Sequence, residues 1–135
     1  LTIQKEVAQR IMAKPPKMNL LAISVQFFAE PKIISYISKE NFRPRPKVDS
    51  AIIRLTPKEK LPTDDVEKFF KIVRAGFSQK RKLLVSNLSK KLKIEKNLIT
   101  DFFKKSQLSY KSRAEELTFS DWLKLAKSFI INKDK

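Results

Sequence analysis

The spacing of apolar and polar residues changes near residue 60. Before that point, residues 32–38 and 50–56 form short runs rich in isoleucine and other β-prone residues, bounded by polar and proline-containing segments, which is typical of strands. After it, apolar residues recur every three or four positions, which is typical of amphipathic helices. The pattern therefore predicts an α/β part over residues 1–60 and a helical part over residues 61–135.

The first part begins with a β-prone stretch over residues 1–4, followed by helical spacing over residues 5–13. Pro15 and Pro16 end that helix, because proline has no amide hydrogen to donate. Residues 20–29 are almost wholly apolar and suit either a helix or a strand buried against a larger body. We expect the strands to come from a parallel sheet, and strands taken from such a sheet leave open edges and exposed apolar faces.

Four apolar stripes predict four helices in the second part. Thr63 or Asp64 is the expected N-cap of the first. The last helix has the clearest start, because Thr118 and Asp121 have capping-box spacing and Leu117 and Trp122 occupy the positions of a hydrophobic staple. We expect the stripes to form the core; they are Val66, Phe69, Phe70, Val73 and Phe77, then Leu84, Leu88 and Leu92, then Leu98, Ile99, Phe102 and Phe103, and last Trp122, Leu123, Ala126, Phe129 and Ile130.

The charge of the chain indicates a polyanionic partner. Thirty Lys and Arg face 14 Asp and Glu, giving a net charge of +16, which exceeds what solubility requires of a small domain. Phosphate backbones attract such a chain and release counterions on binding. The alternative is a lysine-rich composition with solvated faces. Because no apolar run is long enough to span a membrane and no signal peptide is recognisable, we expect a cytoplasmic protein with no membrane partner.

The composition excludes several kinds of chemistry. There is no Cys and no His, so thiolate and imidazole metal sites and nucleophiles are absent. Gly76, the only glycine, lies in a predicted helix, so no glycine-rich loop exists to hold a nucleotide. The paired carboxylates at 64–65 and 115–116 lie at helix starts, where they complement the helix dipole. We expect no metal, cofactor or catalytic residue in this chain.

The segment from Phe42 to Arg54 is the first candidate binding site. Prolines at 44 and 46 force an extended loop that presents Phe42 beside three cations, Arg43, Arg45 and Lys47. A rigid loop of this kind can stack a base and hold its phosphates. Alternatively, Phe42 packs inward and the prolines only shape a turn.

The second candidate site is the basic cluster where one predicted helix ends and the next begins. It consists of Arg74, Lys80, Arg81 and Lys82, and residues 80–96 together carry a net charge of +6. Cations near a helix C-terminus are also stabilising. The cluster fits phosphate binding, and a solvated helix end is the alternative.

Three ordered segments, FRPRPKVDSAIIRL, VRAGFSQKRKLL and SRAEELTFSDWLKLA, together with the opening QKEVAQR, resemble the KsgA-type small-subunit rRNA adenine dimethyltransferases. The resemblance runs from about residue 1 to residue 131. It implies an α/β remnant, the last strands and helices of a Rossmann-like S-adenosylmethionine-dependent methyltransferase sheet over residues 1–60, followed by a small all-α rRNA-binding domain over residues 61–135.

The resemblance also implies roles for particular residues. Phe42 would stack against the flipped target adenine, and Arg45, Lys47, Arg74, Lys80, Arg81 and Lys82 would contact rRNA phosphates. Asp49 and Arg113 would be structural, through ion pairing or capping. The family's cofactor loop and its Asn-Leu-Pro-Tyr-type catalytic motif would lie upstream of Leu1.

The expected function is therefore part of an enzyme that transfers methyl groups from S-adenosylmethionine to two adjacent adenines of small-subunit rRNA. This chain would supply rRNA recognition without the cofactor site, would be inactive alone, and would bind the small ribosomal subunit. Its open sheet edges would favour self-association. The alternatives are a stand-alone, non-enzymatic RNA-binding or ribosome-assembly module, and a relative that has shifted toward DNA.

Overall fold

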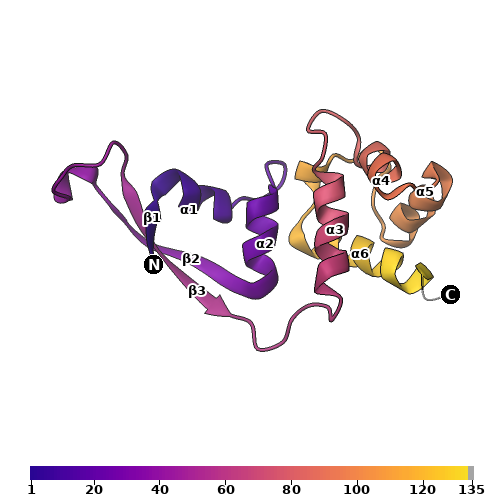
Figure 1. Cartoon of the computed structure of the whole chain (residues 1–135), viewed down its shortest axis with the longest axis horizontal. Helices are drawn as coiled ribbons and strands as arrows, with labels where there is room; N and C mark the ends of the chain where they lie inside the picture. The colour runs from indigo at the N-terminus through magenta and orange to yellow at the C-terminus, as the bar shows by residue number, and fades with distance from the viewer. Residues whose placement is uncertain (134–135) are drawn as a thin grey trace. The chain divides into compact units, whose positions relative to one another are not determined.

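The computed structural model describes the backbone of residues 1–133 and the side chains of residues 1–130. The chain forms two compact units (Figure 1). The first contains Leu1–Ala13 and Leu21–Leu61, and the second contains Lys14–Leu20 and the residues from Pro62 onward. Residues 14–20, which the sequence pattern assigned to the first part, thus group with the second unit. There the Met18 side chain is buried, and its amide donates to the carbonyl of Glu115 at 2.9 Å.

The first unit is built on a three-stranded sheet of order β1-β3-β2. Both pairings are antiparallel, and the strands are β1 (Thr2–Gln4), β2 (Ala29–Ile37) and β3 (Ser50–Pro57). The strands predicted at 32–38 and 50–56 are confirmed, but the expectation of parallel pairing is wrong for these three strands. Residues 38–49 join β2 to its neighbour β3 without a crossover α-helix, and neighbouring strands joined in this way pair antiparallel.

Helices α1 (Lys5–Ile11) and α2 (Leu20–Phe28) pack on one side of this sheet (Figure 1). Ala51 and Ile53 of β3 are 0% and 1% exposed, whereas Ile52 between them is only half-buried. Because successive strand residues face opposite sides, the helices cover the side that carries Ala51 and Ile53. Residues 20–29, for which helix and strand both stayed open, are helical as far as Phe28.

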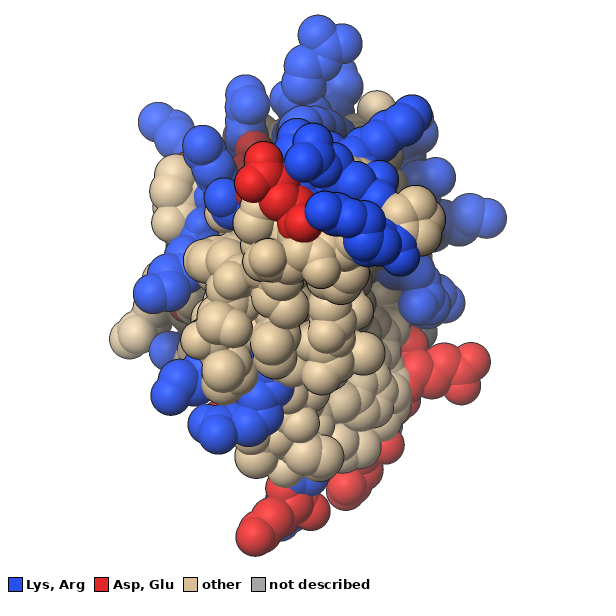
Figure 2. Space-filling model, turned by 90° about the vertical axis from the view of Figure 1, so that its left-hand side faces the viewer, with Lys and Arg blue, Asp and Glu red and all other residues tan. Residues whose placement is uncertain are grey.

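Several large apolar side chains of the first unit remain exposed. Leu1 is 72% exposed, Ile34 49% and Tyr36 51%. Figure 2 shows a broad area without charged side chains, with Lys and Arg gathered above and beside it. Strand β1 lies at an edge of the sheet and has β3 as its only partner among the described residues. An open edge next to exposed apolar surface favours association with another chain.

In the second unit, the described elements after Pro62 are four α-helices and one short 3₁₀ helix: α3 (Val66–Gly76), α4 (Leu84–Leu92), α5 (Lys96–Lys105), η2 (Ala114–Glu116) and α6 (Phe119–Lys133). No helix in the described part of the chain has the length and hydropathy needed to cross a membrane. The side chains at the centre of the core are each less than 2% exposed; they include Phe69, Leu84, Leu88, Ile99, Phe103, Leu117, Trp122 and Leu125. The predicted stripes supply most of this core, but Leu98 is 46% exposed and does not belong to it.

Gly76 lies where α3 passes closest to its neighbours. A Cβ atom added there would lie 2.5 Å from Cη2 of Trp122 and 2.7 Å from Cδ1 of Leu84. The neighbouring Phe77 stacks on Trp122, with ring centroids 5.4 Å apart. The only glycine of the chain therefore serves helix packing, because any larger residue would push α3 away from the indole ring.

The helix starts agree with the sequence in one case and differ in another. The amide of Asp121 donates to Oγ1 of Thr118 at 3.0 Å, and the amide of Thr118 donates to Oδ2 of Asp121 at 3.1 Å, which confirms the predicted capping box. The N-cap of α3 is Asp65, whose Oδ1 accepts from the amide of Lys68 at 3.2 Å. The prediction of Thr63 or Asp64 at that position is wrong by one or two residues.

Candidate nucleic-acid interface

The loop between β2 and β3, residues 38–49, is held at its base by Asp49. Its Oδ1 accepts from the amide of Lys39 at 2.9 Å, and its backbone carbonyl accepts from the amide of Lys5 at 2.9 Å. Inside the loop, Oγ of Ser38 caps the 3₁₀ helix η1 (Lys39–Asn41). Asp49 thus joins the loop to the start of α1, which confirms its predicted structural role and gives the loop a fixed shape.

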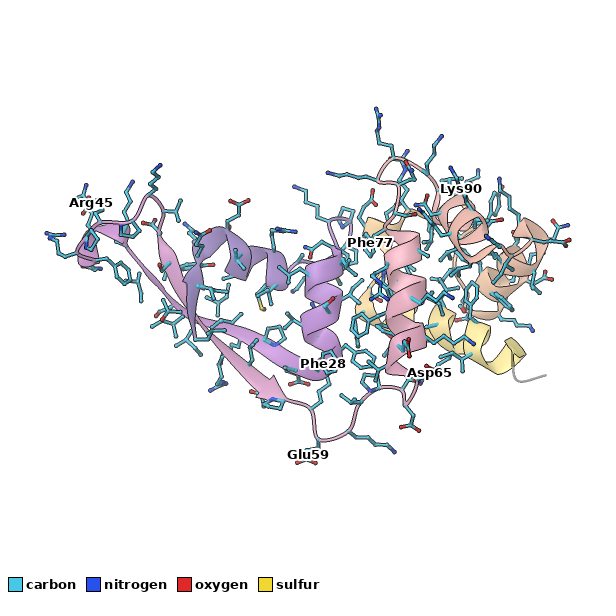
Figure 3. The ribbon with its side chains drawn as sticks, viewed as in Figure 1. Phe28, Arg45, Glu59, Asp65, Phe77 and Lys90 are labelled. Carbon is cyan, nitrogen blue, oxygen red and sulfur yellow. The ribbon has the colours of Figure 1, made fainter. Side chains whose placement is uncertain are left out.

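Two of the three predicted cations of this hairpin loop contact the loop itself. The Nη1 atom of Arg43 donates to the carbonyls of Glu40 and Phe42, each at 3.1 Å. The Nη2 atom of Arg45 lies 3.9 Å from Oε1 of Glu40, and both side chains are more than half exposed. A surface ion pair of this length contributes little, so Arg45 stays available to a ligand. Figure 3 shows Arg45 at the outer end of the loop.

Phe42 follows η1 in an extended conformation, and its amide donates to the carbonyl of Lys39 at 3.3 Å. Its side chain is neither fully buried nor fully exposed. The residue as a whole is therefore partly accessible to solvent. Both sequence-based interpretations of Phe42, base stacking and inward packing, therefore stay predictions.

A hollow of about 430 Å³ lies beside the hairpin loop. Three lysines line it, Lys5, Lys39 and Lys47, together with the carboxylates of Glu6 and Asp49. Sequence reasoning identified Lys47 but missed Lys5 and Lys39. The strand register, which the sequence pattern did not provide, brings Lys5 there, because pairing Gln4 with Ser50 places Lys5 next to Asp49.

The second candidate surface is the turn between α3 and α4, residues 77–83. Lys80, Arg81 and Lys82 are all exposed, and Arg74 is exposed on the last turn of α3. The turn contains no acidic residue. The structure brings these four predicted cations to the C-terminal end of α3, where together they attract an anion.

Asn87 of α4 fixes the shape of this turn. Its side chain is only 3% exposed, and its Nδ2 atom donates to the carbonyls of Gly76 and Gln79, both at 2.9 Å. The amide of Lys82 donates to the carbonyl of Gln79 at 3.2 Å, which tightens the turn further. Sequence reasoning missed this role. The signal was a polar residue between Leu84 and Leu88 on a face that is otherwise apolar.

Further cations follow on α4, where Lys90 and Lys91 lie in the last turn; Figure 3 shows Lys90. At the start of η2, the backbone amide of Arg113 donates to Oε1 of Glu116 at 2.8 Å. This bond does not involve the Arg113 side chain, whose role in ion pairing or capping stays a prediction. Among the described residues, no group of three or more Asp, Glu, His or Cys side chains could hold a metal ion. The two candidate surfaces therefore offer a ligand cations, the partly exposed Phe42 and backbone groups.

A family model described as ribosomal RNA adenine dimethylase matches residues 1–130, nearly the whole chain. The chain belongs to this family. The resemblance carried by the sequence motifs is therefore confirmed for the ribosomal RNA adenine dimethylases.

Curated relatives of the chain support the same family. The chain is 36% identical over 132 residues to the ribosomal RNA small subunit methyltransferase A of Dehalococcoides mccartyi, and 39% identical over 132 residues to that of Crocosphaera subtropica. Both comparisons cover 96% of this chain, but only 45% and 48% of the relatives. The chain thus spans about half the length of the curated relatives it matches.

Two solved structures are similar to the chain. A dimethyladenosine transferase from Plasmodium falciparum matches with a TM-score of 0.80 and 26% identity, covering 97% of this chain and 57% of that one. The 23S rRNA methyltransferase ErmE matches with a TM-score of 0.72 and 19% identity, covering 94% of this chain and 52% of that one. The second match shows likeness of fold alone.

Proposed function

We propose that this chain recognises small-subunit rRNA on behalf of an S-adenosylmethionine-dependent adenine dimethyltransferase, and that it does not itself hold the cofactor. The observation that carries the proposal is the pair of cation-bearing segments, the hairpin loop and the α3–α4 turn, each fixed in shape by hydrogen bonds to Asp49 or Asn87. Preformed cationic loops bind a phosphate backbone without the cost of ordering themselves first.

The residues present do not fit S-adenosylmethionine. Cofactors of this kind are held by a glycine-rich turn that follows a strand, where backbone amides approach the ligand. Gly76 lies inside α3 and packs against Trp122 and Leu84. No methyl-transfer step is therefore assigned to residues of this chain, and calorimetric titration of the chain with S-adenosylmethionine is expected to show no micromolar binding.

In this proposal, residues 1–60 are the last strands and helices of a Rossmann-like sheet, and residues 61–135 are a helical rRNA-binding domain of a cytoplasmic enzyme. The similarity to a solved dimethyladenosine transferase structure supports it. Phe42 stacks on the target adenine once that base has left its helix. Arg43 orders the loop, while Arg45, Lys47, Arg74, Lys80, Arg81 and Lys82 contact phosphates.

Competition binding tests the partner. A labelled fragment of small-subunit rRNA is bound to the chain and displaced by unlabelled RNA or by duplex DNA of the same length. Preference for the rRNA fragment supports the proposal, because the hairpin loop offers a ring to unpaired bases, which duplex DNA does not present. Equal displacement by DNA would contradict it.

A second candidate function is a stand-alone RNA-binding or ribosome-assembly module. The single glycine lies inside α3, so the chain lacks the glycine-rich turn of a cofactor site, and this favours the module. The longer protein that contains this chain distinguishes the two functions. Methylation of small-subunit rRNA by that protein supports the enzyme. Binding of the small subunit without methyl transfer supports the module.

We also propose that the isolated chain self-associates through the first unit. The open edge of β1 and the exposed side chains of Leu1, Ile34 and Tyr36 support this. Light scattering after size-exclusion chromatography is expected to show a species larger than 15.7 kDa that returns toward the monomer in an Ile34→Lys variant. A compact monomer at all concentrations would contradict this proposal.

A further inference from the structure

The second unit contains a hollow that no part of the proposed function uses. It has a volume of about 320 Å³ and is lined by side chains from α3, the end of α4, α5 and α6. Its apolar lining consists of Ile72, Leu92, Ile94, Leu98, Phe102 and Phe129. This size matches a small-ligand site, since such sites begin at about 300 Å³.

The mouth of this hollow has a defined shape. Lys93 ends α4 in the left-handed conformation, with φ 56° and ψ 47°. Ser89 holds the turn that follows, because its hydroxyl donates to the carbonyl of Ile94 at 2.6 Å and its carbonyl accepts from the amide of Ile94 at 3.3 Å. Leu98 lies here with 46% of its surface exposed, although Ile99 and Phe102 on the same helix are buried. Leu98 therefore leaves apolar surface accessible at the mouth of the hollow.

Every charged residue that lines the hollow is a cation: Lys68, Lys71 and Lys93. None of the three ammonium groups has an ion pair within the described residues. Two acids are nearby, since Asp65 and Glu67 line a neighbouring hollow with Lys68 and Lys71. Asp65 is engaged as the N-cap of α3, where it accepts from a backbone amide. Three lysines against these two carboxylates leave a positive balance around the apolar lining, which favours an anionic ligand.

We propose that this hollow binds one unpaired nucleotide of the RNA, with the base against the apolar lining and its phosphates on Lys68, Lys71 and Lys93. That the ligand is RNA rests on the proposed function. The lining offers no polar side chain other than the lysines, so the site would accept any base, as stacking and apolar contact do in single-strand binding. A docked amphipathic helix is the less suitable occupant, because it needs a groove long enough for several anchors along its length.

Methyl NMR on the full chain tests the inference. The chain, labelled at Ile and Leu methyl groups, is titrated with a 5′-phosphorylated tetrauridylate and, separately, with an abasic oligonucleotide of equal phosphate count. The expected result is a shift of the Ile94, Leu98 and Ile72 methyl signals with the tetrauridylate and none with the abasic chain. Equal shifts with both would mean that only phosphates bind, and would overturn the inference.

Filling the hollow provides a second test. Leu98→Trp occupies the mouth, and Leu61→Trp is the matched control, because Leu61 is also an exposed leucine, at 38%, and does not line the hollow. The Leu98 variant is expected to weaken tetrauridylate binding roughly tenfold, within the range known for loss of one base contact. The Leu61 variant should bind as the parent does. Equal affinities of the two variants would contradict the inference.

The remaining outcomes are also decisive. If these methyl groups stay unshifted while RNA affinity still depends on Lys80, Arg81 and Lys82, the hollow is not a nucleotide site and the proposed function stands. If only an acidic amphipathic peptide shifts the signals, a protein is the occupant and the inference is wrong. If the chain binds no RNA at low salt, both this inference and the proposed function fail.

Discussion

The hairpin loop of the first unit and the α3–α4 turn of the second both present cations, but they hold them differently. In the hairpin loop, Arg43 and Arg45 both contact Glu40, by hydrogen bond or ion pair. In the turn, the side chain that fixes the backbone, Asn87, is buried and uncharged, and Lys80, Arg81 and Lys82 all remain exposed. From this comparison we propose that the turn supplies most of the electrostatic attraction and that the loop holds a base.

The largest expected effect is the loss of RNA affinity when the charges of the α3–α4 turn are reversed. Reversing the charges at Lys80, Arg81 and Lys82 to Glu should weaken binding of small-subunit rRNA about a hundredfold or more at low salt, because phosphate contacts become repulsions. The control reverses Lys104, Lys105 and Lys127, which gives the same net charge. Fluorescence anisotropy measures both. Equal losses in the two variants would mean that net charge matters and the turn does not.

The next effect is on stability and comes from Asn87, which holds the α3–α4 turn by hydrogen bonds. Asn87→Ala leaves two carbonyls, those of Gly76 and Gln79, without their donor and should lower the free energy of unfolding by about 1–3 kcal/mol. Asn97→Ala, at an exposed asparagine of α5, should change it by less than about 0.5 kcal/mol. Urea unfolding of the two variants checks this. A difference within error would show that Asn87 does not hold the turn.

Phe42→Ala tests whether the hairpin loop contributes base stacking. The expected result is a loss of about tenfold in affinity for single-stranded RNA, with little dependence on salt, because stacking is lost and no charge changes. Phe42→Trp should restore the affinity. If the alanine variant binds as the parent does, or if its loss disappears at high salt, the ring does not stack on a base.

The smallest effect concerns Glu40. Glu40→Gln removes the carboxylate beside Arg45 and should raise RNA affinity by no more than about threefold, because an exposed ion pair contributes less than about 1 kcal/mol. The gain should shrink as salt rises. Anisotropy at two salt concentrations measures it. A larger gain that persists in high salt would mean that Glu40 restrains the whole loop rather than only the charge of Arg45.

Local signals made parts of the fold predictable. The strand over residues 50–57 and the capping box of Thr118 and Asp121 depend on neighbours within a few positions, so the sequence pattern was sufficient. The N-cap of α3 was missed because Asp64 and Asp65 are both good caps, and only the fold decides which one starts the helix.

Features that depend on distant contacts could not be predicted in this way. The approach of Lys5 to Asp49 follows from the register of β1 with β3, and Met18 joins the second unit through its contact with Glu115. Leu98 continues an apolar pattern, yet the turn at Lys93 and Ile94 leaves it at the mouth of a hollow. In the candidate site, the basic residues were visible in the sequence, whereas the buried amide that organises them, Asn87, was not.

The most direct test of the central claim, that fixed cationic loops make this chain an RNA-recognition unit, is the salt dependence of rRNA binding. Affinity of the parent chain and of the variant with Glu at 80, 81 and 82 is measured over a series of salt concentrations. The account predicts that log affinity falls linearly with log salt for the parent, and that the slope of the variant is shallower by about two units, as expected for three lost phosphate contacts on a single strand. A flat response of the parent chain, or identical slopes for the two proteins, would contradict it.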